Sequence, residues 1–268
     1  MVRRPPSSYP CRARLTSAFL AAVSLAVAAA ASAQGLTPQT IERVKPSIVA
    51  VGTFERLRSP AFLFSGTGFV VGDGLTVVTN DHVLPRLTNT EKGETLAIAI
   101  PGPDNKGAQI RPARKIAADP DSDLALLGID GLALPAMRLV DAPNVREGET
   151  YLFTGFPIGS VLGLFPVTHR SMVAAISPIA IPVARADQLD SRVVRRLNAS
   201  GFSIFQLDAV AYPGNSGSPV YHPETGAVIG IVNSVMVKGS RESALTQPSG
   251  ITYAIPSQRL KALLERAR

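Results

Sequence analysis

The sequence predicts an all-β domain, either a sandwich or a barrel, between Ile48 and Pro256. Two observations support this fold class. Short apolar segments alternate with clusters of Gly, Pro, Asp and Asn, and few stretches repeat with the period of an amphipathic helix. In addition, Asp73-Gly74, a dipeptide typical of tight hairpin turns, separates two of these segments. We therefore expect many short strands joined by tight turns.

The apolar segments that fit strands are spread evenly along this region. In the first half they are residues 48–51, 69–71, 76–78, 96–100 and 124–127, and in the second half residues 151–153, 172–176, 204–207, 228–232 and 251–255. Two helices are expected to bracket them. Thr37-Pro38 combines a capping residue with a proline at the first helical position, which predicts a short helix that ends before Pro46. Ser257 is expected to cap a last helix, residues 257–268, whose leucines dock on the strands.

The first 33 residues have the pattern of a secretory signal peptide. Four arginines and no acidic residue accompany an apolar run from Leu15 to Ala31, and Ala31-Ser32-Ala33 is typical of a cleavage site. We therefore expect residues 1–33 to be removed and residues 34–268 to be exported to the periplasm or secreted. Because the apolar run is about as long as the shortest membrane spans, an uncleaved anchor is the alternative. Only that alternative predicts a membrane-bound protein.

Charge and cysteine content limit the possible partners. The formal net charge is +7, but four of the 27 basic residues and none of the 20 acidic ones lie in the signal segment, so the mature chain carries +3. No basic stripe with interleaved aromatic residues remains, and we expect no nucleic-acid partner. Cys11 also lies in the signal segment, so the mature domain has no thiol or disulfide and must be stabilised by its own core.

Three short motifs contain the residue types needed for nucleophilic catalysis. They are residues 79–83 (TNDHV), 119–127 (DPDSDLALL) and 213–219 (PGNSGSP). A serine hydroxyl is a weak nucleophile, so it needs a base, and a carboxylate must orient that base. We assign Ser216 as the nucleophile, His82 as the base and Asp123 as the orienting group. Each motif alone is common in turns, but their joint occurrence beside predicted strands favours the catalytic interpretation.

The glycines around Ser216 suggest a second element of the site. They allow a tight turn in which the amide hydrogens of Gly214 and Ser216 point at one place. That place is where negative charge develops on the carbonyl of a substrate during attack, and losing one such donor typically costs about 3 to 4 kcal/mol of transition-state stabilisation. We therefore expect Gly214 and Ser216 to form an oxyanion hole.

These motifs resemble those of the chymotrypsin-like (trypsin-like) serine protease superfamily, and most closely those of its bacterial HtrA/Deg-type members. Residues 65–71 (SGTGFVV) and the closing segments 226–233 and 250–256 share the resemblance, which covers about residues 37–265. It implies two six-stranded antiparallel β-barrels, roughly residues 47–140 and 145–256, with the triad between them. It also implies a primary specificity pocket with Val210 as its floor and Asn233, Ser234 and Val235 as one wall. Such a pocket is small and apolar, and favours Val, Ala, Ile or Thr before the cleaved bond.

The chain departs from the family pattern in several places. Ser218 replaces a frequent glycine, and Asp81 places a carboxylate next to the catalytic histidine in sequence. Asn215 stands where secreted digestive relatives carry an aspartate that pairs with a freshly cut N-terminus, so we expect no activation by that route. Residues 177–202 form an insertion that includes a charged helical stretch at 187–197. No PDZ domain is expected after the last helix.

Two functional hypotheses follow from the sequence. The first is an exported serine endopeptidase that acts on polypeptides, especially unfolded ones, through an acyl-enzyme. The alternative is a catalytically silent double barrel that binds unfolded polypeptides or a specific partner. No metal or cofactor is expected, because His169 and His222 lack neighbours at ligand spacing and are assigned to the surface or to loops. The glycines at 66, 68 and 72 also miss the dinucleotide-binding spacing.

Overall fold

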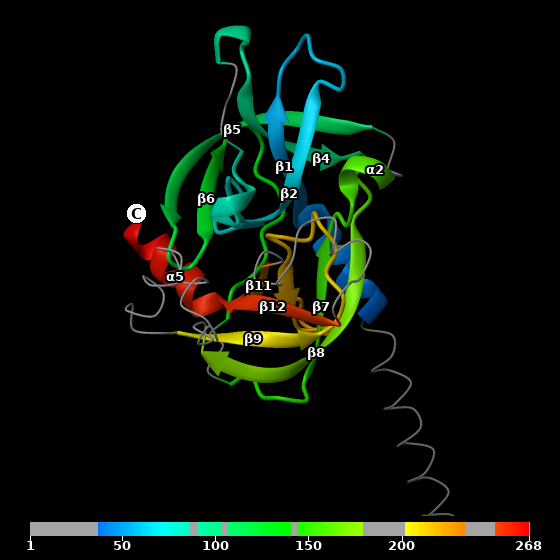
Figure 1. Ribbon diagram of the computed structural model, residues 1–268, viewed down its shortest axis with the longest axis vertical. Coiled ribbons are helices and arrows are strands. Elements are labelled where there is room, and N and C mark those ends of the chain that lie inside the picture. The colour runs from blue at the N-terminus through cyan, green and yellow to red at the C-terminus, as the bar shows by residue number, and fades with distance from the viewer. Residues whose placement is uncertain are drawn as a thin grey trace, which may run out of the picture.

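We describe a computed structural model of the chain over residues 37–85, 90–102, 107–140, 144–178, 202–233 and 250–267 (Figure 1). The signal peptide predicted at 1–33 lies outside these ranges, as do the helical stretch 187–197, almost all of the insertion 177–202, and Ser234 and Val235. Within the described ranges, no helix is both long enough and apolar enough to cross a membrane.

The strands form two closed, six-stranded antiparallel barrels, which confirms the expected fold (Figure 1). In the first barrel the order around the sheet is β1-β2-β3-β6-β5-β4, and in the second it is β10-β11-β12-β9-β8-β7. The first barrel consists of β1 (Ile48–Phe54), β2 (Phe62–Val71), β3 (Thr76–Thr79), β4 (Thr95–Pro101), β5 (Ala108–Asp119) and β6 (Leu124–Ile129). The second consists of β7 (Thr150–Gly155), β8 (Val167–Pro178), β9 (Ser203–Asp208), β10 (Pro219–Tyr221), β11 (Val228–Asn233) and β12 (Ile251–Pro256).

All of the apolar segments assigned to strands lie in strands, but β5 and β10 were not predicted. Strand β5 contains three arginine or lysine residues and a proline, and most of its residues are exposed or half-buried. It therefore lacks the apolar run by which the other strands were found. Strand β10 is only three residues long, although all three are buried. Tertiary pairing with neighbouring strands defines both elements more than their own composition does.

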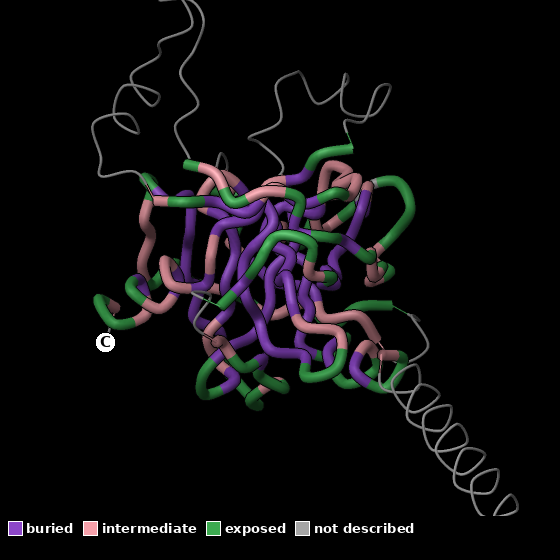
Figure 2. The backbone as a smooth tube through the Cα atoms, turned by 90° about the horizontal axis from the view of Figure 1, so that it is seen from below, coloured by how far each residue is buried: buried purple, intermediate pink, exposed green. Residues whose placement is uncertain are grey.

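Among the described residues, three clusters of apolar side chains form the core, and the largest contains residues of both barrels. Figure 2 shows the buried segments in the interior of the molecule. It includes Ile48, Phe69 and Leu124 of the first barrel and Tyr221 and Ile231 of the second. All five side chains are at most 1 % exposed, so the two barrels share a dry interface. The residues of the candidate site therefore lie on a framework in which the two barrels are packed against each other.

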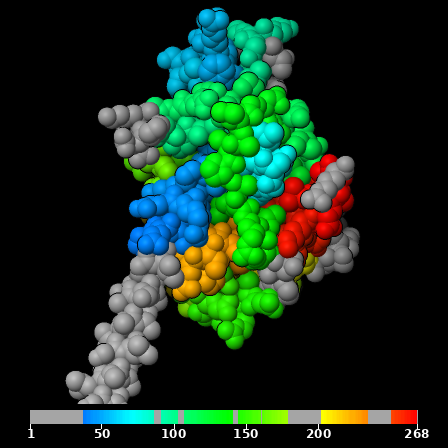
Figure 3. Space-filling view, turned by 180° about the vertical axis from the view of Figure 1, so that it is seen from behind, coloured from blue at the N-terminus to red at the C-terminus, as the bar shows by residue number. Residues whose placement is uncertain are grey.

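Both bracketing helices are present, at the expected ends of the domain. Residues 37–44 are helical, and a 3-10 turn η1 (Lys45–Ser47) leads into β1. The last helix is α5 (Ser257–Arg266), which buries Leu260 and Leu263 against the shared cluster. Figure 3 shows both on one face of the molecule, the N-terminal helix in blue and α5 in red. The expected cap is wrong, because the hydroxyl of Ser257 donates to the carbonyl of Val140 (2.6 Å) and Pro256 occupies the cap position.

Candidate active site

His82 and Asp123 come together because two neighbouring strands end at the same edge of the first barrel. Strand β3 pairs with β6, with Thr79 opposite Ala125. The 3-10 turn η2 (Asp81–Val83) follows β3 directly, and Asp123 directly precedes β6. Nδ1 of His82 lies 2.6 Å from Oδ2 of Asp123, and the backbone amide of His82 donates to Oδ1 at 2.9 Å.

Several hydrogen bonds fix the orientation of Asp123. Its residue is 8 % exposed, and its carboxylate accepts a third hydrogen bond, from Nδ2 of Asn233 to Oδ2 at 2.7 Å. Its own carbonyl accepts hydrogen bonds from Nδ2 of Asn80 and from the amide of Asp81. Because an ionised carboxylate only accepts hydrogen bonds, the short contact places the proton of neutral His82 on Nδ1 and leaves Nε2 as the basic atom.

The contact from Asn233 was missed by sequence reasoning. That reasoning placed Asn233 in a wall of the specificity pocket, whereas its side chain is 1 % exposed and reaches Asp123, 110 positions earlier in the chain. The only sequence signal was its position at the end of an apolar strand near the nucleophile motif. A side chain from the second barrel therefore contacts the acid of the first.

Ser216 lies in the loop between β9 and β10, next to the turn that carries His82. Its carbonyl accepts a hydrogen bond from the amide of Thr67 on β2 (2.9 Å). A side chain at Gly66 would meet both the isopropyl group of Val83 (2.7 Å) and the carbonyl of Ser216 (3.2 Å), so glycine allows these segments to approach. The next residue, Gly217, donates to Val232, which precedes Asn233. The backbone of Ser216 therefore lies close to Val83, the residue that follows His82.

Gly214 sits in a tight turn with the residues that a type II turn requires. The amide of Asn215 donates to the carbonyl of Tyr212 (3.0 Å), Pro213 is the second residue of the turn, and Gly214 has a φ of 101°. The carbonyl of Pro213 accepts a hydrogen bond from the amide of Ile158 at 2.7 Å. Because the peptide unit is planar and trans, the N–H of Gly214 points away from Ile158.

The remaining specificity residues are only partly described. Val210 lies in the loop that follows β9 and is half-buried, six residues before Ser216. Ser234 and Val235 fall outside the described residues. The small apolar pocket expected from these three positions therefore stays a prediction.

The structure describes the contacts of two residues that depart from the family pattern, Asp81 and Ser218. The carboxylate of Asp81 forms an ion pair with Nζ of Lys115 on β5 (3.0 Å), so its negative charge next to His82 in sequence is balanced. Ser218 is fully buried and does not adopt a left-handed backbone, so glycine is not required there. Its hydroxyl occupies space that Gly155 leaves open, because a Cβ at Gly155 would come within 2.0 Å of Ser218 Oγ.

His169 lies on a strand and not in a loop, and it is half-buried. His169 lies on β8, stacked on the fully buried Phe153 with ring centroids 4.6 Å apart and planes 13° apart. Burial lowers the pKa of His169 below its ordinary value, because the charged form is poorly solvated there. His222 does lie in a loop, where its Nδ1 accepts from the amide of Glu224. Across the described residues, no group of three His, Cys, Asp or Glu side chains is arranged to hold a metal ion.

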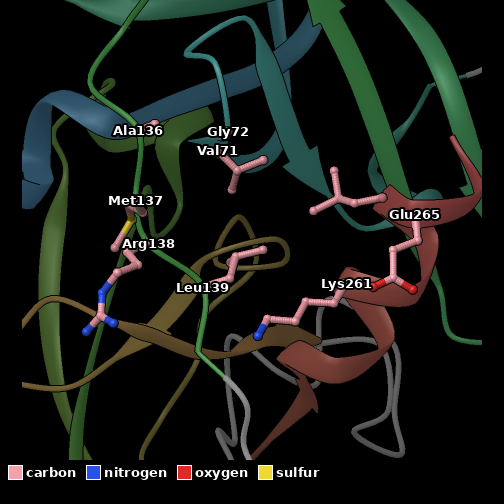
Figure 4. Close-up of a pocket in the computed structure, with 9 residues that line it drawn as sticks. Val71, Gly72, Ala136, Met137, Arg138, Leu139, Lys261 and Glu265 are labelled. Carbon is pink, nitrogen blue, oxygen red and sulfur yellow. The ribbon is translucent and has the colours of Figure 1, made fainter. Parts of the chain in front are cut away.

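A pocket of about 460 Å³ lies apart from these residues, beside α5 (Figure 4). It is lined by the end of β2, by the inter-barrel segment 136–139 and by one face of α5. None of the predicted catalytic or specificity residues contributes to it. It lies between the segment that joins the barrels and the last helix.

Comparisons with known proteins show which family and fold the chain shares. Residues 66–231 match the sequence family described as "Trypsin-like peptidase domain". Serine protease HTRA3 of Rattus norvegicus is 27% identical over 230 residues, which cover 84% of this chain and 42% of that protein. A protein of Ectopseudomonas mendocina named "Probable periplasmic serine endoprotease DegP-like" is 28% identical over 198 residues, covering 74% of this chain and 32% of its own length. The chain thus spans less than half the length of these relatives.

Solved structures show the same fold. The serine endoprotease from Yersinia pestis matches with a TM-score of 0.59 and 24% identity, over 86% of this chain and 66% of that chain. The HtrA-type protease AlgW with tripeptide matches with a TM-score of 0.57 and 23% identity, over 85% of this chain and 61% of that chain.

Proposed function

The chain belongs to the trypsin-like peptidase family, and from this premise we propose that it is a serine endopeptidase that hydrolyses peptide bonds through an acyl-enzyme. One observation carries the proposal. The carboxylate of Asp123 is held by three hydrogen bonds, two of them from His82, so that Nε2 of His82 remains as a base. A double barrel that only binds polypeptides would not need a buried carboxylate held by several hydrogen bonds. The arrangement therefore favours an enzyme over the catalytically silent alternative.

The proposed reaction has two stages. Nε2 of His82 takes the proton of Ser216 Oγ as that oxygen attacks the carbonyl carbon of the substrate, and the tetrahedral oxyanion accepts hydrogen bonds from the amides of Gly214 and Ser216. The protonated His82 then donates its proton to the leaving amine, the C–N bond breaks, and Ser216 is left as an ester. A water molecule, deprotonated by His82, hydrolyses this ester and restores the free hydroxyl.

The proposed substrates are unfolded polypeptides cleaved after small apolar residues. Val210 offers no carboxylate to a basic side chain, and the valine at position 235 narrows the pocket that the family fold implies. A lysine buried there without a partner would cost several kcal/mol. Among small residues the preference should be modest, because one methylene is worth about 1 to 3 kcal/mol in such a pocket.

The proposed site of action is the periplasm or the exterior of the cell. The signal-peptide pattern of residues 1–33 supports export, and the name of the Ectopseudomonas relative describes a periplasmic protein. The mature domain has no cysteine, so its stability is expected to be indifferent to an oxidising compartment.

One experiment tests the activity and the specificity together. The wild type, Ser216→Ala and Ser171→Ala are each incubated with an unfolded protein, and the peptides produced are identified by mass spectrometry. Ser171 is a matched control, because it is a buried serine whose hydroxyl donates to the carbonyl of Tyr151 on β7. We expect Ser216→Ala to lose several powers of ten in rate while Ser171→Ala keeps its activity, with cuts after Val, Ala, Ile or Thr. Hydrolysis by Ser216→Ala at the wild-type rate would refute the mechanism, and cuts mainly after Arg, Lys or Phe would refute the pocket.

A further inference from the structure

Thr67 connects the two barrels through its hydroxyl at the edge of the active site. It lies on β2 of the first barrel and is fully buried. Its Oγ1 donates a hydrogen bond to the carbonyl of Gly214 at 2.7 Å and accepts one from the amide of Phe156 at 3.0 Å. Both partners belong to the second barrel, and they lie in segments that are 58 positions apart in the sequence. A single oxygen therefore joins two separate backbone segments to β2.

These two segments also contact each other, and that contact orients the amide of Gly214. Phe156 begins the segment that carries Ile158, and the amide of Ile158 holds the carbonyl of Pro213 at 2.7 Å. The peptide unit between Pro213 and Gly214 can rotate as a whole, which converts a type II turn into a type I turn and reverses the direction of its N–H. The bond from Asn215 to Tyr212 is common to both turn types. The bond from Ile158 therefore distinguishes the observed orientation from the reversed one.

Ile158 needs support to keep this contact. It adopts a left-handed conformation, with φ 50° and ψ 36°, which is unfavourable for a β-branched residue. Gly214 has no Cβ, so its own backbone offers little resistance to rotation. The hydroxyl of Thr67 ties down the chain two residues before Ile158 and also ties down the turn that Ile158 must reach. The segments on both sides of the Ile158–Pro213 contact are thus hydrogen-bonded to the same atom, Oγ1 of Thr67, on the first barrel.

We propose that Thr67 is a positioning residue, whose bridging hydroxyl aims the amide of Gly214 at the oxyanion and makes the oxyanion hole depend on the docking of the two barrels. This inference rests on the proposed function, because it takes Gly214 as an oxyanion donor. Thr67 does not touch the reacting atoms. It acts through the two backbone segments, so its removal should weaken transition-state binding more than substrate binding.

The test compares three variants of the full chain. Thr67→Val keeps the shape of the side chain but removes the hydroxyl, and Thr67→Ser keeps the hydroxyl. Thr40→Val is the matched control, because Thr40 is 1 % exposed and donates a hydrogen bond of the same length, 2.7 Å, to the carbonyl of Glu224, in a loop between β10 and β11. Active sites are counted by titration with a fluorophosphonate, and kcat and KM are measured on a peptide substrate with valine before the cleaved bond. Binding of a peptidyl boronic acid, whose adduct places an anionic oxygen in the oxyanion position, is measured in parallel.

We expect kcat per titrated site to fall about 10- to 100-fold in Thr67→Val, somewhat less than the roughly 10²- to 10³-fold cost of losing a donor outright. KM should change little, and the affinity for the boronic acid should fall by the same factor as kcat. Thr67→Ser should recover most of the loss, and Thr40→Val should keep wild-type kcat even where its thermal stability falls. If Thr67→Val does not fold, Thr67→Cys, which offers a weaker hydrogen bond, should show an intermediate loss of kcat.

Wild-type kcat per site in folded Thr67→Val, or in Thr67→Cys where that variant replaces it, would overturn the inference, and so would a change in KM alone. The same would follow if Thr40→Val lost as much boronic acid affinity as Thr67→Val, because the effect would then be one of general stability. Ser216→Ala in the same assay separates this from a failure of the proposed function. If Ser216→Ala is inactive and Thr67→Val is normal, only the role of Thr67 is wrong. If Ser216→Ala is active, the proposed mechanism itself is wrong.

Discussion

In the first barrel, His82 and Asp123 are held mainly by groups of their own barrel, whereas in the second barrel Gly214 and the carbonyl of Ser216 are held largely by Thr67 of the first. Two hydrogen bonds join His82 to Asp123 within the first barrel, and a further one, from Asn233, reaches Asp123 across the interface. Gly214 and Ser216 both accept hydrogen bonds from Thr67. His82 and Asp123 are thus positioned mainly within the first barrel, whereas the carbonyls of Gly214 and Ser216 are bonded across the interface.

The hydrophobic clusters inside the two barrels also differ in composition. The cluster inside the first barrel is built of aliphatic side chains such as Val49, Val77 and Leu127. The second barrel buries Phe153, together with a chain of hydroxyl groups that links Thr154 to Thr168 and Tyr221. Polar groups inside a core require specific partners, whereas aliphatic groups require only packing. Thr154 and Tyr221 therefore depend on specific hydrogen-bond partners, whereas the aliphatic cluster of the first barrel depends on packing.

The largest expected effect comes from Asp123→Asn, which breaks the self-contained half of the site. An amide cannot hold the useful tautomer of His82, so kcat should fall by about 10⁴-fold. The fold should remain, because Asp123 has a φ of 54° and asparagine is among the few residues that tolerate this conformation. Hydrolysis rates and thermal unfolding, measured side by side, check both statements. A loss below tenfold would show that His82 is oriented by something other than Asp123.

A smaller effect is expected from Asn233→Ala, which removes the side-chain hydrogen bond that Asn233 donates from the second barrel to Asp123. A hydrogen bond to a charged group contributes about 1.5 to 3 kcal/mol, so the loss in kcat should be about 10- to 100-fold. Asn233→Ser, which can still donate, should lie between this variant and the wild type. If Asn233→Ala were as inactive as Asp123→Asn, the first-barrel half would not be self-contained, and the comparison between the barrels would fail.

The smallest effect concerns stability against pH and involves His169 in the second barrel. Its pKa is lowered by burial in the native state, so the unfolded chain binds the proton more readily. Stability from this group is fully present above about pH 6.5, the ordinary pKa of histidine, and is lost as the pH falls from there through the native pKa. Denaturant unfolding at several pH values should show a flatter profile for His169→Gln than for the wild type. Equal slopes would remove His169 as the source of acid sensitivity.

The sequence was sufficient for the parts of this protein that depend on local chemistry. Asp73-Gly74 sits in the turn between β2 and β3, and the apolar runs mark ten of the strands. The turn chemistry of Pro213 and Gly214 could also be recognised, because the residues that need special backbone angles are adjacent in sequence. Such features are decided within a few residues, and a single sequence contains them in full.

The features that escaped prediction depend on contacts between distant segments. Thr67 and Gly214 are 147 positions apart, and Asn233 and Asp123 are 110 apart. Ser257 was expected to cap the last helix, but its hydroxyl donates instead to the carbonyl of Val140 in the inter-barrel segment. Strand β5 has a composition typical of an exposed loop and is defined by its pairing with β4 and β6. In each case the local pattern allowed several partners, and packing selected one.

The left-handed backbone of Asp123 also bears on how this protein can lose activity over generations. Most replacements at that position would strain the loop, whereas asparagine and glycine would fit it. Each of those two is reached from an aspartate codon by a single nucleotide change. Inactive descendants that survive as binding proteins should therefore carry Asn or Gly at position 123 more often than any other residue.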